Sequence, residues 1–399
     1  MSESAKIFFN PDKKYSVESR MWQGVPAIEK TGKRIWAAYF SGGKYEPCVH
    51  NYGILAYSDD NCESFVDPYM IVAADESIRM RVLDLQLWRE PSGRLWCYWA
   101  QDIYPDDTAE SDYDTDGSTL FTAFFHDIQA YGIYTDDPEA DAPVWSEPIH
   151  IGEGFIRNRP TALPDGRIFV PGYQVKNENY ICYMLSDDLT KGAKNVIGPK
   201  RLGGMGFDEP MAIVQNNGSV RLLTRTDTGY IAESYSTDGG ETFSDAVSTD
   251  IGNPCTRFFI GRLSNGMQLL INTPSSRLGN RRSLVAFLSD DDGKTWKYSM
   301  VIDDRAGTSY PDAVESDDGF IYMIHDVQRD NRQGVDKNDP RRSGAHVLFS
   351  TAAKEICISK FTVADIVSGS PVTEGTYLAK VISKVDFEHR PLGKVEGRY

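Results

Sequence analysis

The chain lacks the features that mark membrane and nucleic-acid-binding proteins. It contains no run of about 18 apolar residues, so no membrane span is expected. Residues 1–6 show neither the basic nor the apolar segment of a secretory signal, which predicts a cytoplasmic protein. Asp and Glu number 58 against 42 Lys and Arg, a net charge of −16. Binding to phosphates needs a clustered positive field, so this balance argues against a nucleic-acid partner.

Paired cysteines and metal-binding spacings are missing as well. The six cysteines are scattered and none forms a C-x-x-C pair, which predicts free thiols rather than disulfides or a zinc site. The histidines show no metal-ligand spacing. We therefore expect neither a metal nor a cofactor.

Turn-forming and aromatic residues are plentiful. The chain has 34 glycines, 20 prolines and 12% aromatic residues, and polar turn clusters recur along its 399 residues. This profile is typical of many short strands joined by tight loops. The sequence therefore predicts one all-β domain over residues 1–399.

One turn pattern recurs in almost complete form. Ser236–Phe243 and Ser289–Trp296 each combine a Ser, acidic residues, a Gly, a Thr and a final aromatic, and each follows a predicted strand. Asp side chains cap backbone amides in such turns, and Gly supplies a positive φ. A degenerate copy covers Ser58–Phe65, and fainter copies start near residues 134, 186 and 350. The two clear copies lie 53 residues apart, which suits a four-stranded propeller blade and predicts six of them.

This turn resembles the Asp-box of the sialidase (neuraminidase) superfamily. The resemblance implies a six-bladed β-propeller of four-stranded antiparallel blades, and glycoside hydrolysis of a carbohydrate substrate. The boxes themselves are expected to be structural turns that identify the fold and carry no chemistry.

The candidate chemistry lies at the starts of later blades. Glu209 and Arg225 should stand at matching ends of one hairpin just before the box at Ser236, and Tyr310 precedes the strand of the following blade. By the resemblance, Tyr310 is the nucleophile, Glu209 is its base and Arg225 binds the substrate carboxylate. A phenol has a pKa of ~10 and is a poor nucleophile at neutral pH, so it needs such a base to accept its proton. A neutral nucleophile also suits an anomeric carbon that carries its own carboxylate.

Two further roles follow from the same resemblance. A second carboxylate-binding arginine is expected at Arg282, with Arg281 as the alternative. The general acid is expected at Glu46, with His50 as the alternative in the same loop. The chain departs from the family at Gly24, where sialidases carry an arginine in an Arg-Ile-Pro segment.

Polar residues at other blade entrances should face the central cavity. Asp84, Arg159 and Arg257 are possible substrate contacts on this ground. They are equally compatible with pairing to one another, which would neutralise a buried channel.

The leading functional prediction is an exo-acting, retaining glycosidase that releases sialic acid or a related acidic sugar. Two alternatives stay open. The missing arginine at Gly24 is compatible with a propeller glycosidase for another sugar, such as a uronide or an arabinoside. A propeller that only binds glycans would need no complete set of nucleophile, base and arginines.

Overall fold

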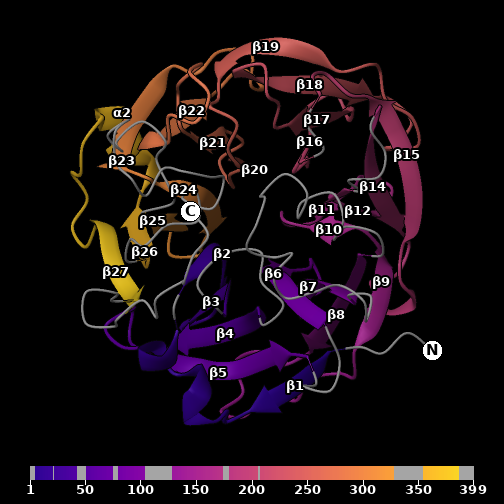
Figure 1. The fold of residues 1–399 in the computed structure, drawn as a ribbon. Helices are drawn as coiled ribbons and strands as arrows, with labels where there is room; N and C mark the ends of the chain where they lie inside the picture. Colours follow the sequence, from indigo (N-terminus) through magenta and orange to yellow (C-terminus); the bar gives the residue numbers. More distant parts are fainter. Residues whose placement is uncertain are drawn as a thin grey trace, which may run out of the picture.

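The computed structural model describes residues 5–20, 22–42, 51–74, 80–103, 128–173, 179–204, 207–327 and 354–385. Six antiparallel sheets surround a central axis, each with its first strand innermost (Figure 1). This arrangement is the predicted six-bladed β-propeller. None of the helices in this part of the chain is long and apolar enough to cross a membrane.

The first two blades come from the N-terminal third of the chain. Blade 1 contains β2 (Gln23–Thr31), β3 (Arg34–Ser41), β4 (Tyr52–Ser58) and β5 (Val66–Ala73). It carries a fifth strand that the repeat pattern did not predict, because β1 (Lys6–Phe9) pairs with β5 at the outer edge. Blade 2 consists of β6 (Met80–Arg89), β7 (Leu95–Ile103), β8 (Gln129–Thr135) and β9 (Ile149–Glu153).

The middle blades have shorter inner strands. Blade 3 consists of β11 (Thr161–Ala162), β12 (Ile168–Val170), β14 (Tyr180–Ser186) and β15 (Lys194–Lys200). A small separate ladder beside it pairs β10 (Phe155–Ile156) with β13 (Gly172–Tyr173). Blade 4 consists of β16 (Met211–Val214), β17 (Val220–Thr224), β18 (Tyr230–Ser236) and β19 (Val247–Gly252).

The last two blades complete the ring. Blade 5 consists of β20 (Phe259–Arg262), β21 (Gln268–Asn272), β22 (Arg282–Ser289) and β23 (Tyr298–Ala306). Blade 6 consists of β24 (Ser309–Glu315), β25 (Ile321–Val327), β26 (Lys354–Phe361) and β27 (Tyr377–Val385). A short helix, α2 (Val363–Ser368), joins the last two strands and begins with a capping box at Thr362 and Asp365.

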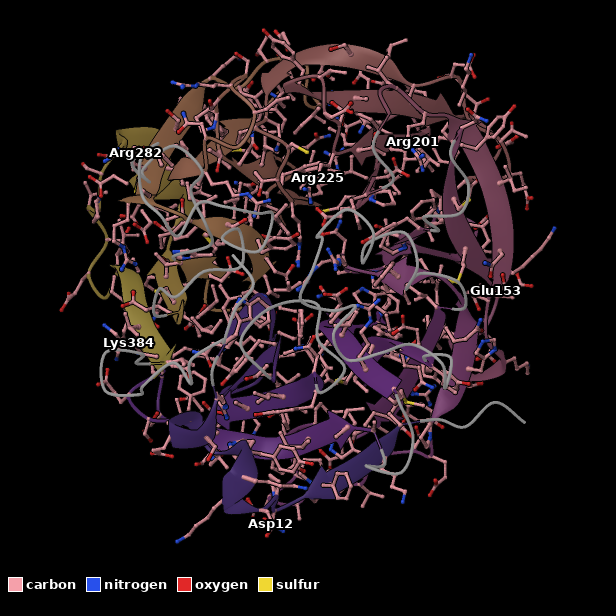
Figure 2. All side chains as sticks on the ribbon, viewed as in Figure 1. Asp12, Glu153, Arg201, Arg225, Arg282 and Lys384 are labelled. Atoms are coloured by element: carbon pink, nitrogen blue, oxygen red, sulfur yellow. The ribbon has the colours of Figure 1, made fainter. Side chains whose placement is uncertain are left out.

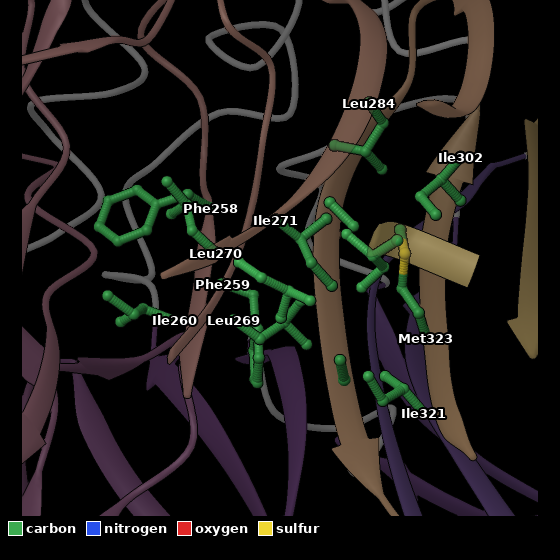
Figure 3. Packing of buried hydrophobic residues seen from close by; sticks show 14 of the residues in the cluster. Phe258, Phe259, Ile260, Leu269, Leu270, Ile271, Leu284, Ile302, Ile321 and Met323 are labelled. Atoms are coloured by element: carbon green, nitrogen blue, oxygen red, sulfur yellow. The ribbon is translucent and has the colours of Figure 1, made fainter. Parts of the chain in front are cut away.

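Hydrophobic residues fill the spaces between neighbouring blades. Blades 5 and 6 share a cluster that contains Leu269, Ile271, Leu284 and Met323, all almost fully buried (Figure 3). Similar clusters join the other neighbouring pairs. Sheet-against-sheet packing therefore stabilises the ring, and polar groups can collect at its axis.

The Asp-boxes form the predicted turns. In the box at Ser289, the serine Oγ donates to Asp291 Oδ1 (2.8 Å) and accepts from Gly293 N (2.8 Å). The degenerate copy at Ser58 has the same geometry, with Cys62 N donating to Ser58 Oγ at 2.9 Å. In both turns the backbone N–H four residues after the serine donates to the serine Oγ. This hydrogen bond is therefore kept even where another residue replaces the glycine of the pattern.

Replacing Ser289 by alanine should lower the free energy of unfolding by about 1–2 kcal/mol, because the buried Gly293 amide would lose its acceptor. Urea unfolding measures this change. Lys294→Ala, at an exposed position of the same turn, is the control and should stay within ~0.5 kcal/mol of wild type. Equal effects of the two replacements would contradict the assigned role of the serine.

Candidate active site

Irregular backbone at the inner ends of the blades brings side chains from several blades to the axis. Asp84, Glu209 and Tyr310 all have positive φ values, of 58°, 39° and 52°. The strand register shifts between Leu83 and Gln86, next to Asp84, and between Ser309 and Asp312, next to Tyr310. Bulges of this kind redirect side chains, and positive φ costs energy for residues other than glycine. Three of the residues with this strained backbone are therefore candidate site residues.

Tyr310 and Glu209 form the centre of the cluster. The Tyr310 hydroxyl donates a hydrogen bond to Glu209 Oε1 at 3.1 Å. Both side chains are buried, Tyr310 at 3% and Glu209 at 1% exposure. Asn158 holds the Glu209 segment by donating to the backbone carbonyls of Glu209 (2.8 Å) and Pro210 (3.0 Å). The nucleophile and base predicted from blades 6 and 4 are thus in direct contact.

Two guanidinium groups surround this pair. Arg225 Nη1 lies 2.9 Å from Glu209 Oε2, an ion pair without hydrogen-bond alignment, and 3.4 Å from the Tyr310 hydroxyl. Arg157 Nη1 lies 3.2 Å from Glu209 Oε1 and 3.4 Å from the same hydroxyl. Arg225 is positioned by its backbone N–H, which donates to the carbonyl of Asp208.

These arginines determine the charge of Glu209. Burial alone would raise the pKa of Glu209, but Arg225 and Arg157, with a smaller contribution from Arg257, lower this pKa to about 2. The carboxylate is therefore ionised across the ordinary pH range and able to accept a proton.

Two more arginines lie at the ring of Tyr310. The guanidinium carbons of Arg257 and Arg281 are 5.9 Å and 5.7 Å from the centroid of the ring. Arg281 also donates to Ser309 Oγ at 2.9 Å. Arg282, the first choice from the sequence, has an exposed side chain at the start of β22, and Figure 2 shows Arg225 closer to the centre of the ring than Arg282. The structure thus places the alternative, Arg281, beside Tyr310.

The remaining predicted contacts are engaged in ion pairs. Arg159 pairs with Asp312 (3.1 Å) and Glu29 (3.4 Å), and Arg257 Nη2 lies 3.9 Å from the same Asp312. Asp84 accepts from Arg157 Nε at 2.5 Å. The three residues are therefore in ion pairs, but their partners are other residues and not one another. Glu46 and His50 lie outside the described residues.

Sequence reasoning assigned no specific role to two residues of the cluster. Arg157 was not among the predicted site residues, although its position two residues before Arg159 at a blade entrance was a signal. Tyr173 is fully buried, stacks on Phe155 with centroids 5.1 Å apart, and has no hydrogen-bond partner for its hydroxyl among the described residues. Burial raises the pKa of Tyr173 well above 10, so its phenol stays protonated.

The position of the missing arginine is closed by other side chains. A Cβ atom on Gly24 would lie 2.8 Å from Asp326 Oδ2 and 2.9 Å from the Trp22 ring. The Asp326 carboxylate is held there, because Oδ2 accepts from Val25 N at 2.9 Å. An indole and a carboxylate therefore stand where the resemblance would place an arginine.

This contact predicts that Gly24→Ala lowers the free energy of unfolding by about 1–3 kcal/mol, because the new methyl group overpacks a filled site. Chemical denaturation measures the loss. Gly204→Ala is the matched control, since its Cβ would find no atom closer than 3.7 Å. A Gly24→Ala protein as stable as this control would show that Trp22 and Asp326 can move aside.

Comparison with known proteins agrees with this architecture. Residues 134–323 match the family described as "BNR repeat-like domain". The anhydrosialidase of Macrobdella decora is 27% identical over 201 residues, a match that covers 46% of this chain and 26% of that protein. The chain thus matches about a quarter of the length of this curated relative.

Two solved structures share the fold at low sequence identity. The intramolecular trans-sialidase from Ruminococcus gnavus superposes with a TM-score of 0.62 at 16% identity, over 91% of this chain and 98% of that one. The leech intramolecular trans-sialidase gives a TM-score of 0.65 at 14% identity, over 92% and 71% of the two chains. The fold and the family match define a six-bladed BNR-repeat propeller. In sequence the chain is similar to an anhydrosialidase, and in fold it is similar to solved intramolecular trans-sialidases.

Proposed function

We propose that the protein is an exo-acting, retaining glycoside hydrolase that releases sialic acid or a related acidic sugar from small glycoconjugates. The observation that carries this proposal is the hydrogen bond from the Tyr310 hydroxyl to Glu209, between the guanidinium groups of Arg157 and Arg225. A binding module has no need of a buried tyrosine paired with an ionised base. The names of the matched relatives, an anhydrosialidase and two intramolecular trans-sialidases, point to the same class of sugar.

In this mechanism, Tyr310 attacks the anomeric carbon while its proton passes to Glu209 Oε1. The bond from the anomeric carbon to the leaving oxygen breaks, and a general acid protonates that oxygen. Water then attacks the anomeric carbon from the face that the aglycone left and gives a proton to the general acid, now acting as a base. The Tyr310 oxygen leaves and takes back its proton from Glu209, so two inversions give net retention. Glu46 is proposed as the acid on the resemblance alone.

The anionic part of the sugar would be held by arginines at the tyrosine ring. Arg225 and Arg281 are the proposed carboxylate ligands, because both lie against Tyr310 and guanidinium groups match carboxylates geometrically. Arg281 takes this role in place of Arg282, whose side chain is exposed. Arg257 would add positive charge close to the ring.

A second product is favoured by the burial of the nucleophile. Tyr310 is only 3% exposed, so a hydroxyl of the bound sugar could reach the glycosyl-tyrosine in place of water. The product would then be an internal anhydro sugar, and the leech structure contains 2,7-anhydro-Neu5Ac. Mass spectrometry distinguishes the anhydro sugar from the hydrolysed free sugar, because the anhydro sugar is lighter by one water molecule.

Incubation with a fluorogenic aryl α-sialoside between pH 4 and 8 tests the proposed function. We expect release of the fluorophore by the wild-type protein. Aryl uronides and arabinosides, assayed in parallel, test the other sugars that the Gly24 position leaves open. Absence of release from every glycoside would contradict the proposed function and favour a glycan-binding propeller.

A further inference from the structure

Arg157 occupies a position that joins three groups of the cluster. It lies between β10 and β11, and its Nε donates to Asp84 Oδ2 at 2.5 Å. Its Nη1 lies 3.2 Å from Glu209 Oε1 and 3.4 Å from the Tyr310 hydroxyl. One nitrogen of Arg157 thus faces both the atom that loses a proton and the atom that gains it.

This geometry suits the movement of charge in the reaction. Before proton transfer the negative charge is on Glu209, and during transfer it develops on the Tyr310 oxygen, 3.1 Å away. Because Arg157 Nη1 is almost equally distant from both atoms, it can stabilise the charge at either end without moving. Donors fixed in advance around developing charge are an effective form of catalysis.

The position of Arg157 is fixed by its neighbours. Asp84 is fully buried and engages Nε, which orients Nη1 toward Glu209. The Phe155 ring lies against the other side of the group, with its centroid 5.1 Å from the guanidinium carbon. Asp84 belongs to blade 2, and Glu209 and Tyr310 belong to blades 4 and 6, so the contact exists only in the closed ring.

We propose that Arg157 is a catalytic residue that stabilises the negative charge on Glu209 and, as the proton moves, on the Tyr310 oxygen, and that Asp84 is its positioning residue. This inference rests on the proposed function. In the step concerned, the Tyr310 O–H bond breaks and the proton joins Glu209 Oε1. The tyrosine oxygen bonds to the anomeric carbon, and the electron pair of the glycosidic bond leaves with the aglycone oxygen.

The role predicts a specific change in pH dependence. Charged and titratable groups both bear on Glu209. The charged groups are Arg157, Arg225, Arg257 and the Asp208 carboxylate, itself paired with Arg201, and the phenols are those of Tyr310 and Tyr173. Burial raises the pKa of Glu209, and the arginines outweigh this effect. Only the ionised carboxylate accepts a proton, so activity falls as the pH drops through this pKa. Removal of Arg157 raises the pKa and moves the acid limb of the rate profile to higher pH.

The test compares kcat/KM from pH 4 to 8 for wild type, Arg157→Met, Arg157→Lys and Asp84→Asn, on an acidic glycoside that the wild type cleaves. For Arg157→Met we expect a loss at every pH, because the charge on the Tyr310 oxygen loses a donor. The loss should grow toward pH 4 to about 10²-fold, because the raised pKa of Glu209 leaves part of this carboxylate protonated there. Arg157→Lys keeps the charge and should restore part of the loss. Asp84→Asn should shift the acid limb in the same direction but less, because an amide oxygen still accepts from Nε.

Asp67→Asn is the matched control. It weakens another ion pair, in which the partly buried Asp67 of blade 1 receives two hydrogen bonds from the buried Arg20. Its acid limb should coincide with that of the wild type, and thermal unfolding shows that each variant is folded.

The outcomes separate the two proposals. If Tyr310→Phe is inactive but Arg157→Met leaves rate and acid limb unchanged, this inference is overturned and the proposed function stands. An equal loss at every pH, without partial rescue by lysine, would also overturn it, because it indicates a purely structural role. A wild-type protein inactive on all acidic glycosides overturns both.

Discussion

Replacement of Tyr310 by phenylalanine should reduce turnover by about 10³-fold or more. Phenylalanine keeps the ring that packs in the axial apolar cluster with Trp22, Phe40 and Tyr173, so the fold should be preserved. It removes only the oxygen that would attack the anomeric carbon, together with the hydrogen bond to Glu209. The release of fluorophore from an aryl α-sialoside measures this loss.

A second buried tyrosine provides the control for this replacement. Tyr183 of blade 3 is 1% exposed, and its hydroxyl donates to the carbonyl of Gly240 in the Asp-box of blade 4 at 2.6 Å. Tyr183→Phe therefore also removes a buried hydroxyl, and it should leave kcat unchanged with a stability loss of about 1 kcal/mol. Wild-type rates in the Tyr310→Phe protein would exclude Tyr310 as the nucleophile.

The largest effect on stability is expected from Asp312→Ala. The Asp312 carboxylate is 1% exposed and receives hydrogen bonds from Arg159 (3.1 and 3.2 Å) and from Ile28 N (2.9 Å). It thus connects β24 of blade 6 with β2 of blade 1 and with the entrance of blade 3. Alanine would remove one of the two carboxylates that neutralise the buried Arg159 and leave only Glu29. The free energy of unfolding should therefore fall by about 3–5 kcal/mol.

Urea unfolding, followed by tryptophan fluorescence, measures this loss. Asp165→Ala is the matched control, because Asp165 also pairs with an arginine, Arg167, but is 43% exposed. Such an exposed pair contributes little, and we expect a change below about 1 kcal/mol. Similar losses in the two variants would show that the axial network does not hold the ring together.

Much of the architecture could be predicted from the sequence, because the relevant interactions are local. The turn at Ser289 depends on bonds between residues at most four positions apart, and the same holds at Ser236 and in the degenerate copy at Ser58. A repeat of such turns fixes the number of blades and the position of each blade entrance. The fifth strand of blade 1 was missed because β1 pairs with β5 far along the chain.

The candidate site was predictable only in part. The order of Glu209, Arg225 and Tyr310 along the chain was informative. Glu209 and Tyr310 stand at blade entrances, Arg225 ends the second strand of the hairpin that Glu209 begins, and these ends meet at the axis. The choice between Arg281 and Arg282 was not, because neighbouring residues at a strand point to opposite sides and the register decides which side faces the axis. The structure places Arg281 at the Tyr310 ring and leaves Arg282 exposed.

By itself, the sequence determined the class of fold and the blades from which nucleophile and base come. Only the tertiary structure decided which charges surround them. Arg157 reaches Asp84, Glu209 and Tyr310, residues that lie between 52 and 153 positions away in the chain. The closing of the ring brings these blades together, and the desolvation of their charges at the axis selects the pairs that form. Such pairing depends on distance in space, which local sequence patterns do not encode.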